Sequence, residues 1–367
     1  MALVLTDEAR MVRETALSFF RERSPITALR KLRDDNDPVG FSRGLWREMA
    51  ELGWTGFLVD EDDGGSGFGM TGLTQVMEAA GRTLTASPLM STALLGASLL
   101  SLAGSDDQKA EYLPPLLAGE QILALALDEG ARHAPDRIAA TAERDGAGYR
   151  LNGEKTFVLD GHIADTLIVA ARTDAGVALF LVPGDAVSRT RLTMVDSRNA
   201  ARIRLDNVAV GPDSMLRPGP ALDLALDRAR TGLAAEMLGS AQEAFDRTVQ
   251  YLKDRKQFGV AIGSFQSLKH RAAQMFCEVE ITRSAVIAAA SALDSGANDA
   301  AALVSLAKAK ANETLFLCGN EGVQMHGGIG MTDEHEIGFF MKRSRVAQAT
   351  FGDTRFCRDR YATAMGY

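Results

Sequence analysis

Long apolar runs are missing from this chain. No stretch of about 18 consecutive apolar residues occurs, so the sequence predicts no helix that crosses a membrane. The N-terminus, MALVLTDEARMVRE, becomes charged at once and does not contain the apolar core of a signal peptide. We therefore expect a cytoplasmic protein.

Cysteines are also few, and basic residues are outnumbered by acidic ones. The three cysteines, Cys277, Cys318 and Cys357, lie in helical sequence without the spacing of a metal site, so we expect buried, reduced thiols. The five histidines show no metal-ligand spacing either, and no metal is expected. With 48 acidic and 40 basic residues the formal net charge is -8, which argues against nucleic acid and anionic membranes as partners.

What the chain does contain is enough apolar sequence for more than one core. Its 367 residues are too many for one compact core and suit two or three domains. Helical spacing of the apolar residues holds over 1–117, short runs of β character fill 118–216, and helical spacing returns over 217–367. These changes of period predict an α+β protein with three domains at those boundaries.

Turn signals support the same division. Thr6 and Asp7 form a suitable N-cap for a first amphipathic helix, and Gly53 is placed to end a later one. In the middle segment, residues 144–146 (Arg-Asp-Gly) and 183–184 (Pro-Gly) separate short runs of β character. Six or seven such runs in about 95 residues predict a small antiparallel barrel or sandwich between two helical domains.

Two stretches of the last segment carry the strongest functional signal. RKQFG, at residues 255–259, stands at the end of a long amphipathic helix, just before a short apolar turn. QMHGGIG, at residues 324–330, is a Gly-Gly break inside otherwise helical sequence. Each glycine destabilises a helix by roughly 1 kcal/mol, so a break of this kind is typical of backbone that something must approach closely. We expect a ligand site at these two stretches.

The whole chain resembles the acyl-CoA dehydrogenase flavoprotein family. The resemblance rests on WREMAELGWTGFLVDEDDGGSGFG at 46–69, RKQFGVAIGSFQSLKH at 255–270 and QMHGGIGMTDE at 324–334, which occur in family-like order and separation. It implies a helical N-terminal domain, a central β-domain and a C-terminal four-helix bundle. It also implies an FAD-dependent oxidoreductase that introduces a 2,3 double bond into an acyl-CoA thioester and passes electrons to an electron-transfer flavoprotein.

The resemblance further implies where FAD is held. Six residues would hold its ADP half across a subunit interface: Arg255, Gln257, Phe258, Gln324, Gly327 and Gly328. A guanidinium can fork onto a pyrophosphate, an aromatic ring can cover adenine, and glycines let backbone N–H groups approach a phosphate. Phe157 and Thr354 are the other residues expected at the cofactor.

Ordinary structural roles compete with this interpretation. Arg255 can pair with Asp254 at the surface, and Phe258 can be a core residue. Gly327 and Gly328 can form a turn between two helices. The occurrence of all the motifs in family order favours the flavin interpretation over these separate roles.

The catalytic base of the family is missing from its usual place. The chemistry removes a proton from the carbon next to the thioester, which needs a carboxylate near the substrate. Most members carry a glutamate in a Tyr-Glu-Gly-Thr-like segment, which corresponds here to residues 350–354, Thr-Phe-Gly-Asp-Thr. Alignment on Thr354 places Gly352 at the glutamate position. Asp353, one residue away, is a candidate base, although an Asp-Thr pair at a helix start is also an N-cap.

The second place for a base in the family is empty as well. Some members carry the base on the helix ahead of the Arg-x-x-Phe signature, one residue before an arginine, which is Arg230 here. The residue in that position is Ala229. Glu236, two turns further along, is another candidate base, with a pair to a basic neighbour as the alternative. Arg230 is the expected contact to the substrate.

The β-domain also differs from the family in the two segments that contact the flavin ring in family members. Thr-Glu-Pro and Trp-Ile-Thr, which hydrogen-bond and flank the ring in the family, correspond to residues 127–129 (Leu-Asp-Glu) and 157–159 (Phe-Val-Leu). Phe157 can still stack on the ring, whereas the hydroxyl groups are gone. A carboxylate at Asp128 would disfavour the negative charge that builds up when the flavin is reduced.

Functions of different classes follow from these observations. One is an acyl-CoA dehydrogenase that assembles as a homodimer or homotetramer, for a fatty, steroid side-chain, dicarboxylic or aromatic acyl group. Another is a non-catalytic partner subunit in a heterotetramer with a paralogue that retains the base. A related oxidase or monooxygenase that keeps the flavin is a third.

Overall fold

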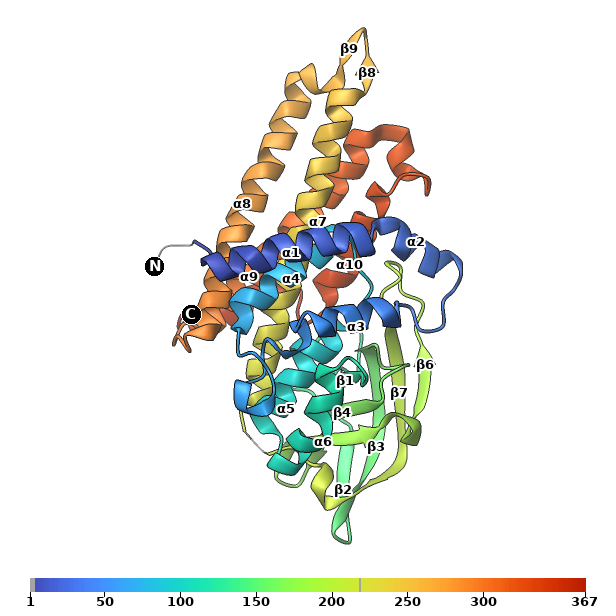
Figure 1. Cartoon of the computed structure of the whole chain (residues 1–367), viewed down its shortest axis with the longest axis vertical. Coiled ribbons are helices and arrows are strands. Elements are labelled where there is room, and N and C mark those ends of the chain that lie inside the picture. Colours follow the sequence, from blue (N-terminus) through green and yellow to red (C-terminus); the bar gives the residue numbers. More distant parts are fainter. Residues whose placement is uncertain (1–3, 218) are drawn as a thin grey trace. The chain divides into compact units, whose positions relative to one another are not determined.

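The computed structural model describes residues 4–217 and 219–367. Contacts divide the described chain into two compact units, whose elements are labelled in Figure 1. Unit 1 comprises the described residues of Met1–Lys31, Met70–Thr85 and Arg230–Tyr367, and unit 2 comprises Leu32–Gly69 and Ala86–Ala229. The first 117 residues, expected as one helical domain, thus contribute to both units, and the three domain boundaries stay predictions.

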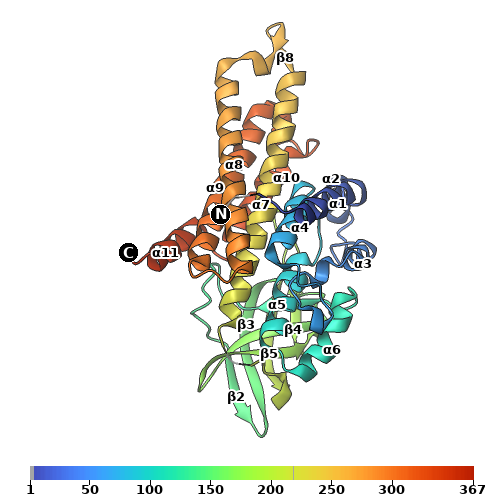
Figure 2. The ribbon, with the colours of Figure 1, turned by 60° about the vertical axis from the view of Figure 1, so that its left-hand side comes forward.

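Long helices make up most of unit 1. The C-terminal bundle consists of α7 (Ala221–Asp254, which begins in unit 2), α8 (Gln266–Asp294), α9 (Ala300–His326) and α10 (Ile337–Ala349), with α11 (Thr354–Ala364) packed on α9. Figures 1 and 2 show α7 and α8 running side by side and joined at one end by the β8–β9 hairpin. The expectation of a helical C-terminal bundle is confirmed.

Two glycines let α4 (Gly69–Arg82) lie directly against α7. A Cβ added to Gly81 would come within 2.0 Å of the carbonyl oxygen of Glu236, and one added to Gly239 within 1.8 Å of that of Glu78. No side chain fits between backbones at this separation, so both positions require glycine. The close approach places the helix that follows Arg230 firmly within unit 1.

The N-terminal helices begin and end where the sequence indicated. Thr6 caps α1 (Asp7–Arg23) by accepting a hydrogen bond from the backbone N–H of Ala9 at 3.2 Å. The short helix α3 (Arg43–Glu51) ends two residues before Gly53, which has φ 76°. A glycine in the left-handed region just beyond a helix is a frequent stop signal. The helix α2 (Ile26–Asp34) lies between α1 and α3 in the sequence.

Three helical elements of unit 2 follow one another in the sequence just before its sheet. They are the π-helix η3 (Leu89–Gly96), α5 (Ala97–Ala103) and α6 (Asp106–Leu117). The side chain of Thr92 in η3 donates to the carbonyl oxygen of Leu123 at 3.1 Å and accepts from its N–H at 3.2 Å, which holds η3 on the first strand.

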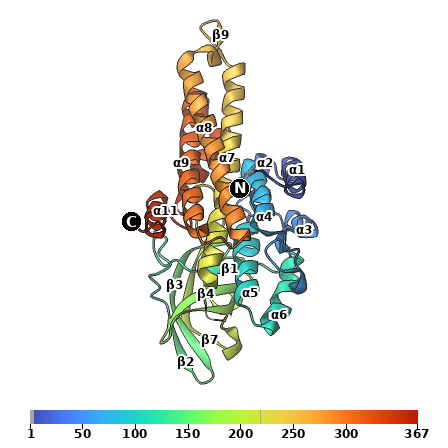
Figure 3. The same cartoon turned by 90° about the vertical axis from the view of Figure 1, so that its left-hand side faces the viewer.

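A seven-stranded sheet forms the β-domain. Its strands are β1 (Leu123–Ala126), β2 (Thr141–Asp145), β3 (Gly148–Leu159), β4 (Thr166–Thr173), β5 (Gly176–Pro183), β6 (Ser188–Arg191) and β7 (Ala200–Val210). They are ordered β1-β4-β2-β3-β7-β6, with β5 on β4, and Figure 3 shows the sheet curled. The predicted β-domain is confirmed. It is mostly antiparallel, but β1 and β2 both pair in parallel with β4.

Strand β3 is irregular next to Phe157. Its pairing with β7 shifts register between Lys155 and Val158, which is the signature of a β-bulge. Phe157, inside the shift, has φ 53°, a conformation that is unusual for a bulky residue. The bulge turns this side chain out of the regular alternation, and it is 45% exposed.

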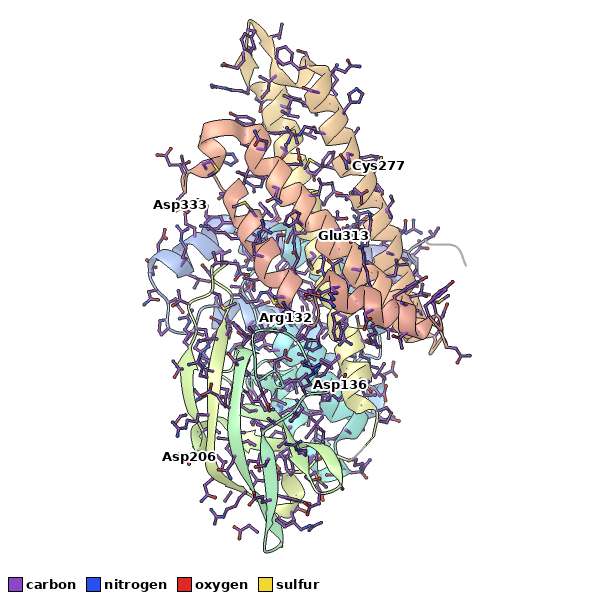
Figure 4. All side chains as sticks on the ribbon, turned by 180° about the vertical axis from the view of Figure 1, so that it is seen from behind. Arg132, Asp136, Asp206, Cys277, Glu313 and Asp333 are labelled. Atoms are coloured by element: carbon purple, nitrogen blue, oxygen red, sulfur yellow. The ribbon has the colours of Figure 1, made fainter. Side chains whose placement is uncertain are left out.

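Two of the three cysteines are buried. Cys318 and Cys357 are buried free thiols, as expected, and burial raises the pKa of Cys318 to about 12. Cys277, which was also expected to be buried, is instead exposed on α8 (Figure 4). Over residues 4–217 and 219–367, no helix has the length and apolar character to cross a bilayer.

Candidate functional site

The Arg-Lys-Gln-Phe-Gly motif folds into a tight hairpin at the end of α7. Strands β8 (Lys256–Gln257) and β9 (Val260–Ala261) pair antiparallel, and the two residues between them, Phe258 and Gly259, have φ 54° and 78°. Two-residue hairpins of this kind normally select Asn, Asp or Gly, because both turn residues need positive φ. An aromatic residue there is strained by roughly 1–2 kcal/mol.

Neither Phe258 nor Arg255 has the ordinary role considered from sequence. The ring of Phe258 is 91% exposed and lies edge-on to that of Phe265 at 6.0 Å, so it is not a core residue. The carboxylate of Asp254 accepts hydrogen bonds from Gln250 Nε2 at 3.0 and 2.9 Å rather than pairing with Arg255. Within the described residues, the exposed guanidinium of Arg255 makes no hydrogen bond or ion pair. The tip therefore presents a strained aromatic and a free cation to solvent.

The Gly-Gly motif ends α9. Gly327 has φ 64° and its N–H donates to the carbonyl oxygen of Gln324, after which η7 (Gly327–Met331) begins. Gln324, Gly327 and Gly328 are exposed, and a Cβ added to either glycine would meet nothing within 4 Å. The backbone at this point is open to close approach, as the sequence motif indicated.

The rings of Tyr251, His326 and His335 form a cluster next to that segment. The ring of His326 stacks on Tyr251 at 4.4 Å and lies 4.5 Å from that of His335. Nδ1 of His326 lies 2.6 Å from the carbonyl oxygen of Gly322, so this nitrogen carries the hydrogen. Burial lowers the pKa of both histidines, which favours the neutral form of each ring.

The two motifs do not meet within one chain. In Figure 1 the β8–β9 hairpin stands at the far end of α7 and α8, whereas η7 is set back along the bundle. Figure 4 shows the same separation, with the label of Asp333, just after η7, well below the hairpin. The structure therefore groups Arg255, Gln257 and Phe258 at one place and Gln324, Gly327 and Gly328 at another.

The loop at the family's usual base position is built around glycine. Gly352 has φ 115°, and a Cβ there would lie 2.4 Å from Cδ1 of Phe356. The ammonium of Lys308, fully buried, donates to the carbonyl oxygen of Gly352 at 3.2 Å and to Asn312 Oδ1 at 2.6 Å. Any side chain at this position would be both strained and crowded.

Asp353 acts as a helix cap. Its Oδ1 accepts a hydrogen bond from the N–H of Phe356 at 2.8 Å, and its carboxylate is the N-cap of α11. Thr354 is the first residue of that helix and is half-buried. The capping role, one of the two alternatives open from sequence, is the one the hydrogen bonds show.

Arg230 and Glu236 are both engaged inside unit 1. Nε of Arg230 donates to the carbonyl oxygen of Phe351 at 3.0 Å, and its guanidinium lies 5.4 Å from the ring centre of Phe356. Oε1 of Glu236 accepts from Arg343 Nη1 at 2.8 Å in a buried ion pair. These contacts give both residues structural roles, and their catalytic roles stay predictions.

Unit 2 brings together the two segments that were expected to lie at a flavin ring. The N–H of Thr156 donates to the carbonyl oxygen of Asp128 at 2.8 Å, so residues 127–129 lie against the bulge that displays Phe157. Lys155 Nζ donates to the carbonyl oxygen of Leu127 at 3.1 Å and strengthens the same junction.

Sequence reasoning missed two buried charged residues of this unit. The Lys155 side chain is fully buried and burial lowers its pKa, while Oε1 of Glu129 accepts from its ammonium at 2.7 Å. Asp160 is buried as well, and burial raises its pKa to about 6. A lysine inside a strand of otherwise β character is the signal that would have pointed to Lys155, because lysine is almost never fully buried without a partner.

Known proteins resemble this chain along its whole length. Three family models match in succession: the acyl-CoA dehydrogenase N-terminal domain at residues 6–120, middle domain at 128–208 and C-terminal domain at 221–366. A 3-(aryl)acrylate reductase of Clostridium sporogenes is 32% identical over 365 residues, which cover 94% of each chain.

Solved structures show the same likeness in three dimensions. A variant of the steroid ACAD Tcur3481-Tcur3483 superposes with a TM-score of 0.89 at 30% identity, over 98% of each chain. The ChsE4-ChsE5 complex from Mycobacterium tuberculosis superposes with a TM-score of 0.92 at 26% identity, over 100% of this chain and 99% of that chain.

Proposed function

Because the chain belongs to the acyl-CoA dehydrogenase family, we propose that it binds FAD and introduces a 2,3 double bond into an acyl-CoA thioester. Members of this family are flavoproteins and oxidoreductases that act on CH–CH bonds. Electrons then pass to an electron-transfer flavoprotein. Fatty, steroid side-chain, dicarboxylic and aromatic acyl groups are all candidate substrates.

The proposal that the chain binds FAD rests mainly on the tip of the β8–β9 hairpin. Phe258 is strained and 91% exposed, and Arg255 has no partner within the described chain. The ring suits adenine and the guanidinium suits a pyrophosphate, with Gln257 between them. The open backbone at Gly327 and Gly328 suits a phosphate or ribose oxygen. When bound, FAD supplies the hydride acceptor for the reaction.

The separation of the two motifs favours a site shared between copies. We propose that the hairpin of one copy and the Gln324–Gly328 segment of another hold the same FAD, in a homodimer or homotetramer. Phe157 would stack on the ring and Thr354 would add a hydroxyl. Arg230 would hold the loop at Phe351 in place beside the acyl thioester, through the hydrogen bond that it already makes.

Anaerobic titration of the purified protein with acyl-CoAs tests the activity. We expect flavin absorbance in the visible to bleach with at least one member of a panel that includes fatty, steroid side-chain and aromatic thioesters. Free carboxylic acids of the same compounds are the matched control and should leave the absorbance unchanged. A yellow protein that no thioester bleaches would contradict catalysis by this chain alone.

Arg255→Ala should weaken FAD binding without weakening the fold. Loss of a charge-assisted hydrogen bond to a phosphate corresponds to about 1.5–3 kcal/mol, so the dissociation constant of FAD should rise roughly 10- to 100-fold. The melting temperature of the FAD-free protein should not change, since the side chain has no partner within the described chain. Lys253→Ala, an exposed cation two residues earlier, is the control for general charge loss. Equal retention of FAD by both variants would show that Arg255 does not contact FAD.

A second candidate function is a non-catalytic partner subunit. It is favoured by the loop at Gly352, which has no room for a side chain, and by the engagement of Asp353 and Glu236 with other groups. Under this proposal a paralogue with the base completes the enzyme, and one of the similar structures is a complex of two differently named chains. Under the first proposal, Asp353 or Glu236 takes the proton after leaving its present partner.

Co-expression distinguishes the two candidates. A partner subunit should co-purify with a paralogue that retains the glutamate, and the pair should bleach with acyl-CoA when neither chain does so alone. Gly352→Glu in this chain should not restore bleaching. If the chain purifies by itself, yellow and reduced by an acyl-CoA, the partner-subunit candidate is wrong.

A further inference from the structure

A cavity of about 350 Å³ lies between three helices of unit 1, α1, α4 and α7 (Figures 1 and 2). Its volume falls within the range of about 300–1,000 Å³ that is usual for small-molecule sites. Each helix contributes residues spaced three or four apart, such as Leu17 and Arg21 on α1, which therefore share one face of the helix. None of the residues proposed to hold FAD lines this cavity, so it is a candidate for a second binding site.

Part of the cavity wall is apolar. Four of the lining residues carry aliphatic side chains: Leu17, Pro25, Ile26 and Ala79. The hydroxyl of Thr85 donates to Ser24 Oγ at 3.1 Å, which fixes the turn between α1 and α2 at the end of α4. Because burial of apolar surface is favourable, this part of the wall suits an aliphatic or aromatic group of a ligand.

The part of the wall that α7 forms has more carboxylates than guanidinium partners. Arg82 Nη2 pairs with Glu243 Oε2 at 2.8 Å and with Asp246 Oδ2 at 2.6 Å. Arg247 pairs with the other oxygen of Glu243 at 2.9 Å, and with Glu336, which does not line the cavity, at 2.7 Å. Three carboxylates thus share two guanidinium groups, which leaves this network one formal negative charge.

Arg21, on α1, supplies an unpaired positive charge to the same cavity. Within the described residues its exposed guanidinium makes no hydrogen bond or ion pair. Gln250, on α7, donates through Nε2 to Asp254, whereas its Oε1 accepts no hydrogen bond from the described part of the chain. The lining groups, counted with Glu336, are therefore neutral as a whole but carry separated charges. A simple anion would leave the carboxylate excess unpaired, and a simple cation would leave Arg21 unpaired.

We propose that this cavity binds a free α-amino acid with an apolar side chain. The ligand carboxylate accepts hydrogen bonds from the fork of Arg21, and its ammonium group donates to Asp246 and to Gln250 Oε1. Each oxygen of Asp246 accepts one hydrogen bond at present, from Gln242 and from Arg82. A carboxylate has about four lone-pair sites, so the ammonium group binds without breaking these contacts. The ligand side chain packs on the apolar part of the wall.

Saturation-transfer NMR of the purified full-length protein with L-leucine, L-methionine and L-phenylalanine tests the proposal. At least one of the three should bind saturably. The matched probes for leucine are 4-methylpentanoate, which lacks the ammonium group, and 3-methylbutylamine, which lacks the carboxylate. Each should bind roughly tenfold more weakly than leucine, because one of the two charged contacts is missing. Absence of binding by all three amino acids, or equal binding of leucine and its matched probes, would overturn the proposal.

Arg21→Gln shows whether leucine binds in this cavity. The dissociation constant of leucine should rise roughly tenfold, while that of 3-methylbutylamine should stay the same, since this probe does not need the guanidinium. Arg10→Gln is the matched control, because Arg10 is an exposed cation of the same helix that does not line the cavity. It should bind leucine as the natural protein does. Unchanged leucine binding by Arg21→Gln would contradict the assignment.

The outcomes are independent of the proposed function. Neither FAD content nor reduction by an acyl-CoA enters these measurements, so failure of the proposed activity leaves the amino-acid site standing. The comparison of leucine with its two matched probes uses the natural protein alone. It therefore decides the proposal even if Arg21→Gln fails to fold.

Discussion

Lys308→Met is expected to lower the free energy of unfolding by about 1–3 kcal/mol, the range for leaving buried hydrogen-bond acceptors without their donor. The ammonium of Lys308 donates to Asn312 Oδ1 at 2.6 Å and to the carbonyl oxygens of Ala347 and Gly352 at 3.1 and 3.2 Å. Methionine fills a similar volume but leaves these acceptors without that donor. The acceptors lie on α9 and on the residues around the end of α10, so the variant also loosens the loop at the empty base position.

Urea denaturation of both proteins checks this prediction. Lys310→Met is the matched control, since Lys310 lies on the same helix and pairs with Glu278 where solvent reaches both side chains. Ion pairs of that kind contribute about 0–1 kcal/mol, so the control should unfold close to the natural protein. Equal midpoints for the two variants would show that the contacts of Lys308 do not stabilise the loop.

Asp160→Asn is expected to stabilise the protein at neutral pH. Oδ2 of Asp160 accepts from Ser91 Oγ at 2.6 Å and Oδ1 accepts from Asn199 Nδ2 at 3.1 Å, and the carboxyl is fully buried. Burial raises its pKa from 3.8 to about 6. At about 1.36 kcal/mol per pKa unit, the buried charge destabilises the fold by roughly 2–3 kcal/mol above that pH. Asparagine removes the charge, and it tolerates the residue's φ of 54° well.

The sign of the pH dependence follows from the raised pKa. Between the unfolded value of 3.8 and the folded value of about 6, the folded protein binds the proton more tightly than the unfolded chain does. Stability of the natural protein therefore falls as pH rises through this window, whereas the variant has no such loss. The advantage of Asp160→Asn should grow from acid pH upward and level off above about pH 7.

Thermal unfolding of the natural and variant proteins across this pH range measures that difference. Asp206→Asn, an exposed carboxylate on β7, is the control for the loss of one negative charge (Figure 4). It should leave the melting temperature close to that of the natural protein at every pH. An advantage of Asp160→Asn that stays constant with pH would show that the carboxyl is not buried in its charged form.

Local sequence was sufficient for several features of the site. The Gly327-Gly328 break and the Arg255–Gly259 stretch were recognisable because their conformations depend on glycine and on a tight turn, which neighbouring residues determine. The N-cap at Thr6 was predictable for the same reason, and the cap at Asp353 was one of two alternatives. The change in the spacing of apolar residues that separates the β-domain from the helices can also be recognised without any knowledge of packing.

Other features depended on contacts between distant parts of the chain. The ion pair of Glu236 with Arg343 and the burial of Asp160 between Ser91 and Asn199 join residues far apart in sequence. No local pattern specifies such partners. The parallel pairing of β1 with β4 likewise needs the sheet itself, since alternation along a strand is the same for either direction of its neighbour.

The amino-acid sequence by itself determined the order of helical and β segments, the turn that follows the Arg-Lys-Gln-Phe-Gly stretch and the absence of a glutamate at position 352. Each of these follows from residue type and near neighbours. Only the tertiary structure decided that a buried ammonium and the ring of Phe356 enclose Gly352, and that Asp128 and His133 form a pair against β3. Burial and partner determine what a charged group does, and both arise only when distant segments pack together.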